Sequence, residues 1–125
     1  HRPDGEPFAF AGLWEVWRGP KDAEGNRTGE PLRSCTIITT TPNETMALIH
    51  DRMPVILPPS AWEEWLDPDN DDIETLGKLL VPAPASVTEL RPVSTEVNNV
   101  RNKGADLATE IPADQIIVGP DPDDG

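Results

Sequence analysis

The sequence predicts an α+β domain with mostly antiparallel strands and short helices. Fifteen prolines and 9 glycines interrupt a chain of 125 residues that is 36% hydrophobic, and this composition disfavours a helical bundle, although it also allows a mostly β domain. Segments rich in β-branched residues alternate with polar stretches that contain Gly and Pro, which is typical of strands and their connections. The length suffices for one domain with a modest core.

Two strands are predicted early in the chain. Residues 7–17, PFAFAGLWEVW, carry apolar side chains at both odd and even positions, so we expect a central strand with both faces covered. Residues 34–40 are rich in β-branched residues and form the next strand, joined to the first by a polar connection over residues 18–33. Shorter strands are expected at residues 53–57 and 87–93.

Helix-start signals precede three short segments. Thr41-Pro42-Asn43-Glu44 has the pattern of a capping box with Pro at the first helical position, which makes Thr41 the expected cap. Ser60-Ala61-Trp62-Glu63 has the same pattern. Apolar spacing then predicts that this second helix packs through Trp62, Trp65 and Leu66. A third helix is expected over residues 72–80, with four apolar side chains facing inward: Ile73, Leu76, Leu79 and Leu80.

The acidic charge is concentrated in two places. The net charge of −13 argues against a nucleic-acid partner at first sight. However, five acids lie in residues 67–74 and six more in residues 106–124, and the remaining 12 of the 23 acids nearly balance the 10 Lys and Arg residues. Both runs are explained most simply by solvation. We therefore expect a domain over residues 1–107 that is nearly neutral outside the acidic run at 67–74, and an acidic, flexible tail over residues 108–125.

Cysteine and histidine usage limits the possible chemistry. The single cysteine, Cys35, excludes an internal disulfide and indicates a reducing compartment, so we expect a cytoplasmic protein. Its apolar neighbours favour a buried thiol over a nucleophile. With only two histidines and no paired cysteines, no metal site is expected, and no motif indicates a cofactor. No apolar run reaches the roughly 20 residues of a membrane span.

His50 is the main candidate for chemistry. It lies between the predicted helical turn and the apolar residues 53–57, and Asp51 and Arg52 follow it directly. Because its intrinsic pKa lies near neutrality, a histidine can both accept and donate a proton. The competing interpretation is a structural histidine bonded to a backbone carbonyl, and Asp51 and Arg52 could equally form a plain ion pair.

Two further groups could contact a ligand. Thr39 and its neighbouring threonines end the second predicted strand, where a hydroxyl could bind a phosphate or sugar oxygen; β propensity and helix capping explain them as well. Residues 98–104, NNVRNKG, are rich in amides and basic side chains. They could bind nucleic acid through Asn99, Arg101 and Lys103, or form only a capped loop.

Four blocks in this order resemble the SOS response-associated peptidase (SRAP) family. They are DGEPFAFAGLWEVW (4–17), SCTIITTTPNETMALIHDRMPVIL (34–57), PPSAWEEWL (58–66) and PVSTEVNNVRNKGADL (92–107). The HDRMP block is the most specific of them. The resemblance implies a β-rich, barrel-like fold, of which this chain would be the C-terminal part.

The resemblance also implies a function. Family members bind single-stranded DNA and capture abasic sites, because the amine and thiol of an N-terminal cysteine close a thiazolidine with the sugar aldehyde. The same cysteine is linked to autoproteolytic peptidase activity. His50 matches the family's catalytic histidine and Thr39 a threonine that lines the DNA site. Arg52, Asn99, Arg101 and Lys103 match regions near the DNA groove.

The sequence departs from the family pattern at several catalytic positions. No N-terminal cysteine is present, and Cys35 is internal and has no free α-amine. The family's catalytic asparagine and glutamate are not found either, and Glu15 does not match that glutamate. We expect that the N-terminal half of the same protein supplies these groups and covers apolar strand faces of this chain. The alternatives are an inactive remnant that binds single-stranded DNA weakly at most, and, less well supported, an unrelated hydrolase using His50 and Asp51.

Overall fold

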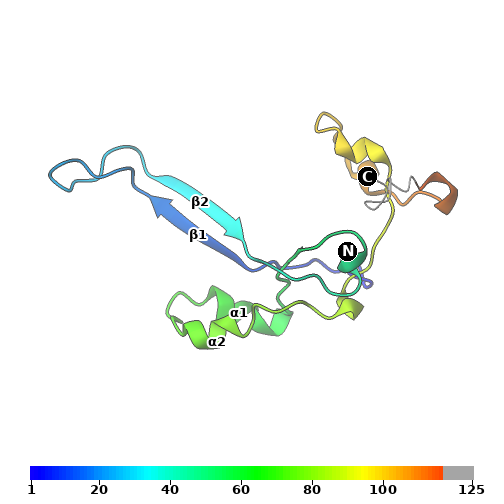
Figure 1. Ribbon diagram of the computed structural model, residues 1–125, viewed down its shortest axis with the longest axis horizontal. Helices are drawn as coiled ribbons and strands as arrows, with labels where there is room; N and C mark the ends of the chain where they lie inside the picture. The colour runs from blue at the N-terminus through cyan, green and yellow to red at the C-terminus, as the bar shows by residue number, and fades with distance from the viewer. Residues whose placement is uncertain (117–125) are drawn as a thin grey trace. The chain divides into compact units, whose positions relative to one another are not determined.

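The computed structural model describes residues 1–116. The chain divides into two units, His1–Glu89 and a second unit that begins at Leu90, and each is described by itself (Figure 1). The first unit contains two antiparallel two-stranded sheets, β1–β2 and β3–β4, and short helices. The predicted mixed α+β class with antiparallel strands is therefore confirmed.

The longest strands form a hairpin. β1 (Gly12–Trp17) pairs with β2 (Leu32–Ile37) in a register that places Trp14 opposite Cys35. Gly19 begins the connection between them with φ +77°, a conformation that L side chains rarely adopt, and a Cβ there would overlap the Thr28 carbonyl. The predicted strand–connection–strand arrangement over residues 7–40 is thus observed, with the first strand shorter than predicted.

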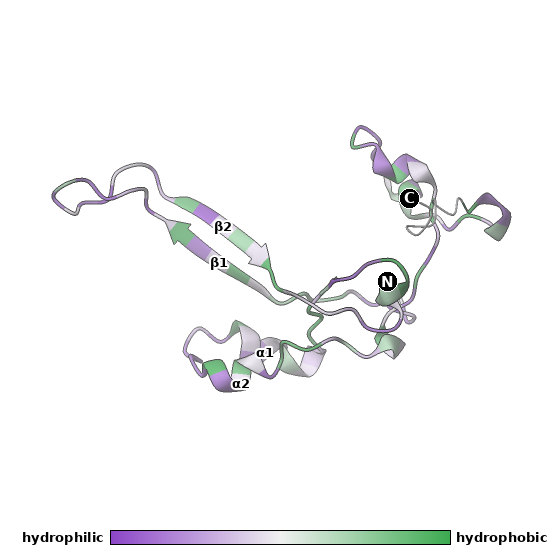
Figure 2. Ribbon diagram, in the orientation of Figure 1, coloured by the Kyte–Doolittle hydropathy of each residue, from purple (hydrophilic) through white to green (hydrophobic). Residues whose placement is uncertain are grey.

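The strands of this hairpin contain both hydrophobic and hydrophilic residues (Figure 2), and apolar side chains on both of its faces are exposed. Trp14 is 75% exposed on one face, and Trp17 and Leu13 are 51% and 55% exposed on the other. Within the described residues β1 pairs with β2 alone, so the expected central position is not observed. The prediction of a buried Cys35 is wrong, because its thiol is exposed: a two-stranded sheet buries neither face unless another layer packs on it.

A small core forms where three segments meet at the base of the hairpin. Ala11 donates its N–H to Val55 O, Ile38 donates to Ala11 O, and Val55 donates to Ile38 O, all at 2.8–2.9 Å. Ala11 and Val55 are fully buried and Leu57 nearly so. Partly buried side chains surround them: Ile38, Trp62, Trp65, Leu79 and Leu80.

The second sheet continues directly from this core. β3 (Thr39–Thr40) pairs antiparallel with β4 (Met53–Pro54), with Thr39 opposite Pro54 and Thr40 opposite Met53. Residues 41–52 connect the two strands and contain the 3₁₀ turn η1 (Met46–Leu48). The expected strand at residues 53–57 is therefore only two residues long, followed by a single bridge between Ile56 and Phe10.

The α-helices are short and partly differ from the prediction. η2 (Pro59–Ala61) leads into α1 (Trp62–Leu66), and no side chain caps either one, so the predicted capping box at Ser60 does not form. Trp62 and Trp65 pack on the core as expected, and Trp65 Nε1 also donates to Gly12 O at 3.2 Å. Leu66, in contrast, is 76% exposed.

The third predicted helix is shorter than expected. α2 spans Ile73–Gly77, with Asp72 as its cap. Leu79 and Leu80 reach the core, but Ile73, the first residue of α2, is 84% exposed. The strand expected at residues 87–93 is absent from the structure: η3 (Ala85–Val87) occupies its start.

The second unit is built from short turns. It contains η4 (Thr95–Asn98), η5 (Ala105–Ala108) and η6 (Ala113–Gln115), and one antiparallel bridge joins Val93 to Glu110. The predicted tail over 108–125 is described only as far as residue 116, and the rest of it lies outside the described residues. The expected barrel-like core is not observed either, because the strands of residues 1–116 form two separate two-stranded sheets.

Candidate functional site

His50 lies in the connection between β3 and β4, and the backbone around it is fixed by the turn that precedes it. The N–H groups of Ile49 and His50 both bind Met46 O, at 3.0 and 2.9 Å. Two residues after His50, Arg52 leads into β4, where Met53 is buried. Antiparallel pairing at both ends and a hydrogen-bonded turn between them therefore hold the histidine's backbone.

Asn43 anchors this turn to the interior of the unit. Its Oδ1 accepts the Met46 N–H at 2.9 Å, and its Nδ2 donates to Ala83 O at 3.0 Å and to Thr88 Oγ1 at 3.1 Å. Its backbone N–H binds the Met53 sulfur at 3.1 Å. The residue is 8% exposed, so a buried amide with both of its polar ends bonded replaces the expected Thr41 cap.

The His50 ring contacts both residues that follow it. Nδ1 is 3.0 Å from the Arg52 backbone N and 3.2 Å from Asp51 Oδ1. An N–H donor at 3.0 Å requires an unprotonated Nδ1, whereas the ion pair with Asp51 requires a protonated one, so the two interactions exclude each other. The Asp51 side chain is 92% exposed, and water screens its charge. We therefore assign the neutral ring the amide bond, which leaves the proton on Nε2.

Arg52 and Thr39 form the second half of the site. The guanidinium Nε and Nη2 of Arg52 donate to Thr39 Oγ1 at 3.0 and 2.7 Å, and Nη2 also reaches Thr39 O at 3.2 Å. Thr39 lies on β3 and Arg52 just before β4, so pairing of the two strands brings them together. Both side chains are exposed.

This cluster unites three of the six predicted site residues. Hydrogen bonds link His50, Arg52 and Thr39: the Arg52 backbone N–H binds the His50 ring, and the Arg52 guanidinium binds Thr39. An exposed imidazole can transfer a proton, and a guanidinium held in place by Thr39 can bind an anionic oxygen such as a phosphate. The arrangement therefore suits an anionic substrate that undergoes proton transfer.

The other three predicted residues lie in the second unit. Asn99 Oδ1 accepts the Arg101 N–H at 3.0 Å, and Asn99 O accepts the Asn102 N–H at 2.9 Å. Asn102 in turn donates its side-chain amide to Glu96 O at 2.9 Å. These bonds make residues 96–102 a capped loop, with Arg101 and Lys103 exposed on it. The two groups of predicted residues therefore belong to separate units of the chain.

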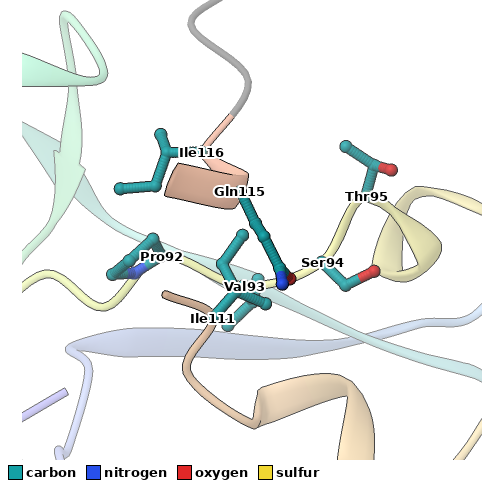
Figure 3. A pocket seen from close by; sticks show the side chains of 7 residues that line it. All are labelled: Pro92, Val93, Ser94, Thr95, Ile111, Gln115 and Ile116. Atoms are coloured by element: carbon teal, nitrogen blue, oxygen red, sulfur yellow. The ribbon is translucent and has the colours of Figure 1, made fainter. Parts of the chain in front are cut away.

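Both units of the chain contain cavities. One of about 290 Å³ in the second unit is lined by seven residues from two segments, 92–95 and 111–116 (Figure 3): Pro92, Val93, Ser94, Thr95, Ile111, Gln115 and Ile116. A larger one of about 390 Å³ in the first unit has mostly apolar and proline walls, with Arg2 and Lys78 also lining it. A third, on the hairpin, is lined by Trp14, Arg33, Ser34 and Cys35. None of the three contains a predicted site residue.

Neither metal binding nor membrane insertion gains support from the described part of the chain. No group of three His, Cys, Asp or Glu residues in positions 1–116 could hold a metal ion. Over the same positions, no helix has the length and apolar character needed to cross a membrane.

Comparison with known proteins assigns the family. Residues 1–100 match the family model described as SOS response associated peptidase (SRAP). The chain belongs to this SRAP family. The match covers all of the first unit and the first residues of the second, and it includes all of the His50 cluster.

Named relatives agree with this assignment. The chain is 49% identical over 100 residues to "Abasic site processing protein YoqW" of Bacillus subtilis, a match that covers 80% of this chain and 42% of that protein. It is 41% identical over 96 residues to "Abasic site processing protein HMCES" of Gallus gallus, covering 76% and 26%. The chain therefore spans about two fifths or less of these relatives' lengths.

A solved structure supports the fold. A crystal structure of a protein from Bacteroides thetaiotaomicron superimposes with a TM-score of 0.68 at 23% identity, covering 89% of this chain and 46% of that one. At this identity the similarity concerns the fold alone. More than half of that neighbour lies outside the matched region.

Proposed function

We propose that this chain forms part of a site that binds single-stranded DNA at abasic sites, with His50 as its proton-transfer group. The observation that carries the proposal is the bonded cluster of Thr39, Arg52 and His50. The relatives named as abasic site processing proteins, which share the family and up to 49% identity, support the choice of substrate.

In this proposal each residue of the cluster has one role. The Arg52 guanidinium binds a phosphate oxygen of the DNA backbone, since a charged fork of N–H donors suits that group. The Thr39 hydroxyl orients the guanidinium and does not itself contact DNA, because the arginine already engages it. The neutral His50 ring donates a hydrogen bond from Nε2 to an oxygen of the abasic sugar. The protonated ring, with its Nδ1–H bonded to Asp51, transfers the Nε2 proton to that oxygen during ring opening and becomes neutral. Asn99, Arg101 and Lys103 add backbone contacts on a separate loop.

The covalent step would require a nucleophile from outside these 125 residues. Closing a thiazolidine with an aldehyde needs an amine and a thiol on the same residue, and Cys35, the one cysteine of these 125 residues, is internal. We propose that an N-terminal part of the family fold supplies that cysteine and the peptidase activity linked to it. The same part would pack on both apolar faces of the β1–β2 hairpin and complete a barrel-like sheet.

Binding tests the DNA part of the proposal. Fluorescence anisotropy would compare labelled single strands with and without one abasic site, and the same sequence as a duplex, at two salt concentrations. We expect salt-sensitive binding to single strands that is weakened in Arg52→Gln and retained in Arg27→Gln, a matched change in the hairpin connection whose guanidinium binds Gly19 O. Equal binding by both variants would refute the role of Arg52.

A second candidate is an inactive module that binds single-stranded DNA weakly. The specific observation in its favour is the exposed, internal position of Cys35 together with a net charge of −13. Incubation of the 125-residue chain with an abasic single strand, followed by a denaturing gel, separates chemistry from binding. We expect no shifted band for this chain alone; a covalent band would show that the polypeptide carries its own nucleophile.

A further inference from the structure

We infer that Asn43 is the positioning residue of the His50 site, and that it acts by holding the histidine ring in the form with its proton on Nε2. The inference rests on the proposed function in one respect only: the proposed function supplies the substrate that Nε2 would face. It begins from a residue that belongs to none of the predicted site groups and yet makes five hydrogen bonds, three of them with its side chain.

The hydrogen bonds form a continuous chain from Asn43 to Thr39. Asn43 Oδ1 accepts from Met46 N, Met46 O accepts from His50 N, and His50 Nδ1 accepts from Arg52 N. Arg52 then donates through its guanidinium to Thr39 Oγ1. Each bond measures 2.7–3.0 Å, within the range of well-formed hydrogen bonds. The two ends of this chain differ in burial, since Asn43 is buried and Thr39 is exposed.

Asn43 is the member of the chain that fixes the others. Its amide donates to Ala83 O and Thr88 Oγ1, two groups more than 35 residues further along the sequence, so the turn cannot move without breaking buried bonds. Unsatisfied buried polar groups are unfavourable. The turn therefore keeps the spacing at which the Arg52 amide meets His50 Nδ1.

The consequence concerns the direction of proton transfer. With Nδ1 occupied by an N–H donor, the neutral ring presents Nε2–H, and Nε2 forms no hydrogen bond to any residue of the described chain. A neutral ring in this form offers a hydrogen-bond donor to a ligand oxygen and cannot act as a base through Nε2. Asp51 is the other charged group near Nδ1, at 3.2 Å, and it becomes a partner only when the ring is protonated.

Nuclear magnetic resonance on the isotope-labelled 125-residue chain tests the inference without DNA. Spectra at about pH 8 should show a scalar coupling across the hydrogen bond between the Arg52 amide nitrogen and His50 Nδ1. Asn43→Ala should abolish this coupling while the amide signals of the β1–β2 hairpin persist. Asn102→Ala, which removes an exposed side-chain bond to Glu96 O, is the matched control and should leave the coupling unchanged.

Two outcomes would overturn the inference: no coupling in the wild-type chain, or an undiminished coupling in Asn43→Ala. If Asn43→Ala does not fold, Thr88→Val replaces it, because it removes one of the two acceptors of the Asn43 amide and keeps the asparagine. A reduced coupling in Thr88→Val would support the inference, and an unchanged one would contradict it. Since the readout contains no DNA, its failure would leave the proposed DNA binding standing.

Discussion

The Arg52 guanidinium holds the Thr39 hydroxyl between two of its nitrogens, Nε at 3.0 Å and Nη2 at 2.7 Å. Thirteen residues separate the two in sequence, and pairing of β3 with β4 makes them neighbours. This fork uses one edge of the guanidinium. The Nη1 edge makes no hydrogen bond within residues 1–116, so it is the edge available to a ligand.

Thr39→Val should weaken binding of single-stranded DNA by roughly fivefold, the equivalent of one hydrogen bond of about 1 kcal/mol. Valine keeps the shape and the β propensity of threonine but offers no acceptor, so the guanidinium would lose its fixed orientation. Anisotropy titrations would measure the affinity. Thr40→Val is the matched control, because Thr40 lies on the same strand and makes no bond to Arg52; a loss of similar size in that variant would contradict the prediction.

Arg52→Gln should lower the salt dependence of DNA binding as well as the affinity. Each phosphate contact to a single strand contributes about 0.7 to the slope of log affinity against log salt concentration. Removing one contact should therefore reduce the slope by about that amount. Titrations at four or more salt concentrations provide the slopes. A variant with lower affinity but the wild-type slope would show that Arg52 acts by shaping the His50 loop and not by binding phosphate.

Leu57→Ala should destabilise the first unit by about 2–5 kcal/mol, because it removes a buried side chain from a small core. Leu66→Ala is the matched control, since Leu66 is 76% exposed, and it should change the unfolding free energy by no more than about 0.5 kcal/mol. Urea denaturation followed by tryptophan fluorescence would measure both. Equal effects would place Leu57 outside the core.

Acid should weaken the cap that the Asp72 carboxylate provides to α2. Hydrogen bonds from the Thr75 hydroxyl and the Thr75 N–H lower the pKa of Asp72 below its ordinary value of 3.8. Because the folded-state pKa is depressed, the stabilisation is present above pH 3.8 and is lost as the pH falls through the folded-state value. The amide proton shift of Thr75 should therefore titrate with a midpoint below 3.8, and this titration should disappear in Asp72→Asn. A midpoint above 3.8 would contradict the assignment.

Local sequence signals predicted much of the first unit, and the predictions that were wrong have different physical causes. β-branched residues and a Gly-containing connection led to the β1–β2 hairpin, since pairing of neighbouring strands depends on nearby sequence. The predictions that Cys35 and Leu66 are buried were wrong. Burial depends on what packs on a surface, and the spacing of apolar residues along one strand or helix does not reveal that. The Thr41 cap was wrong because Asn43 has acceptors at Ala83 and Thr88, contacts far away in sequence.

The candidate site was predicted only in part, because some of its contacts depend on residues far apart in sequence. His50 and Arg52 were found from their residue types and the HDRMP block, and their contact follows from adjacency in the chain. The Arg52–Thr39 bond required knowledge of the β3–β4 register. Asn43 was named only within a capping pattern. Its five partners lie between residues 46 and 88, and no local pattern in the sequence indicates such a set.

The exposed hairpin has a consequence for the motions of the chain. A two-stranded ribbon with little buried surface has few contacts that oppose its local opening, and such ribbons are marginal in water. The amides of β1 and β2 should therefore exchange with deuterium much faster than those of Val55 and Leu57, whose N–H groups bond within the core. Any layer that packs on Trp14 and Trp17 would slow that exchange. Deuterium uptake along the hairpin would thus report the arrival of a binding partner residue by residue.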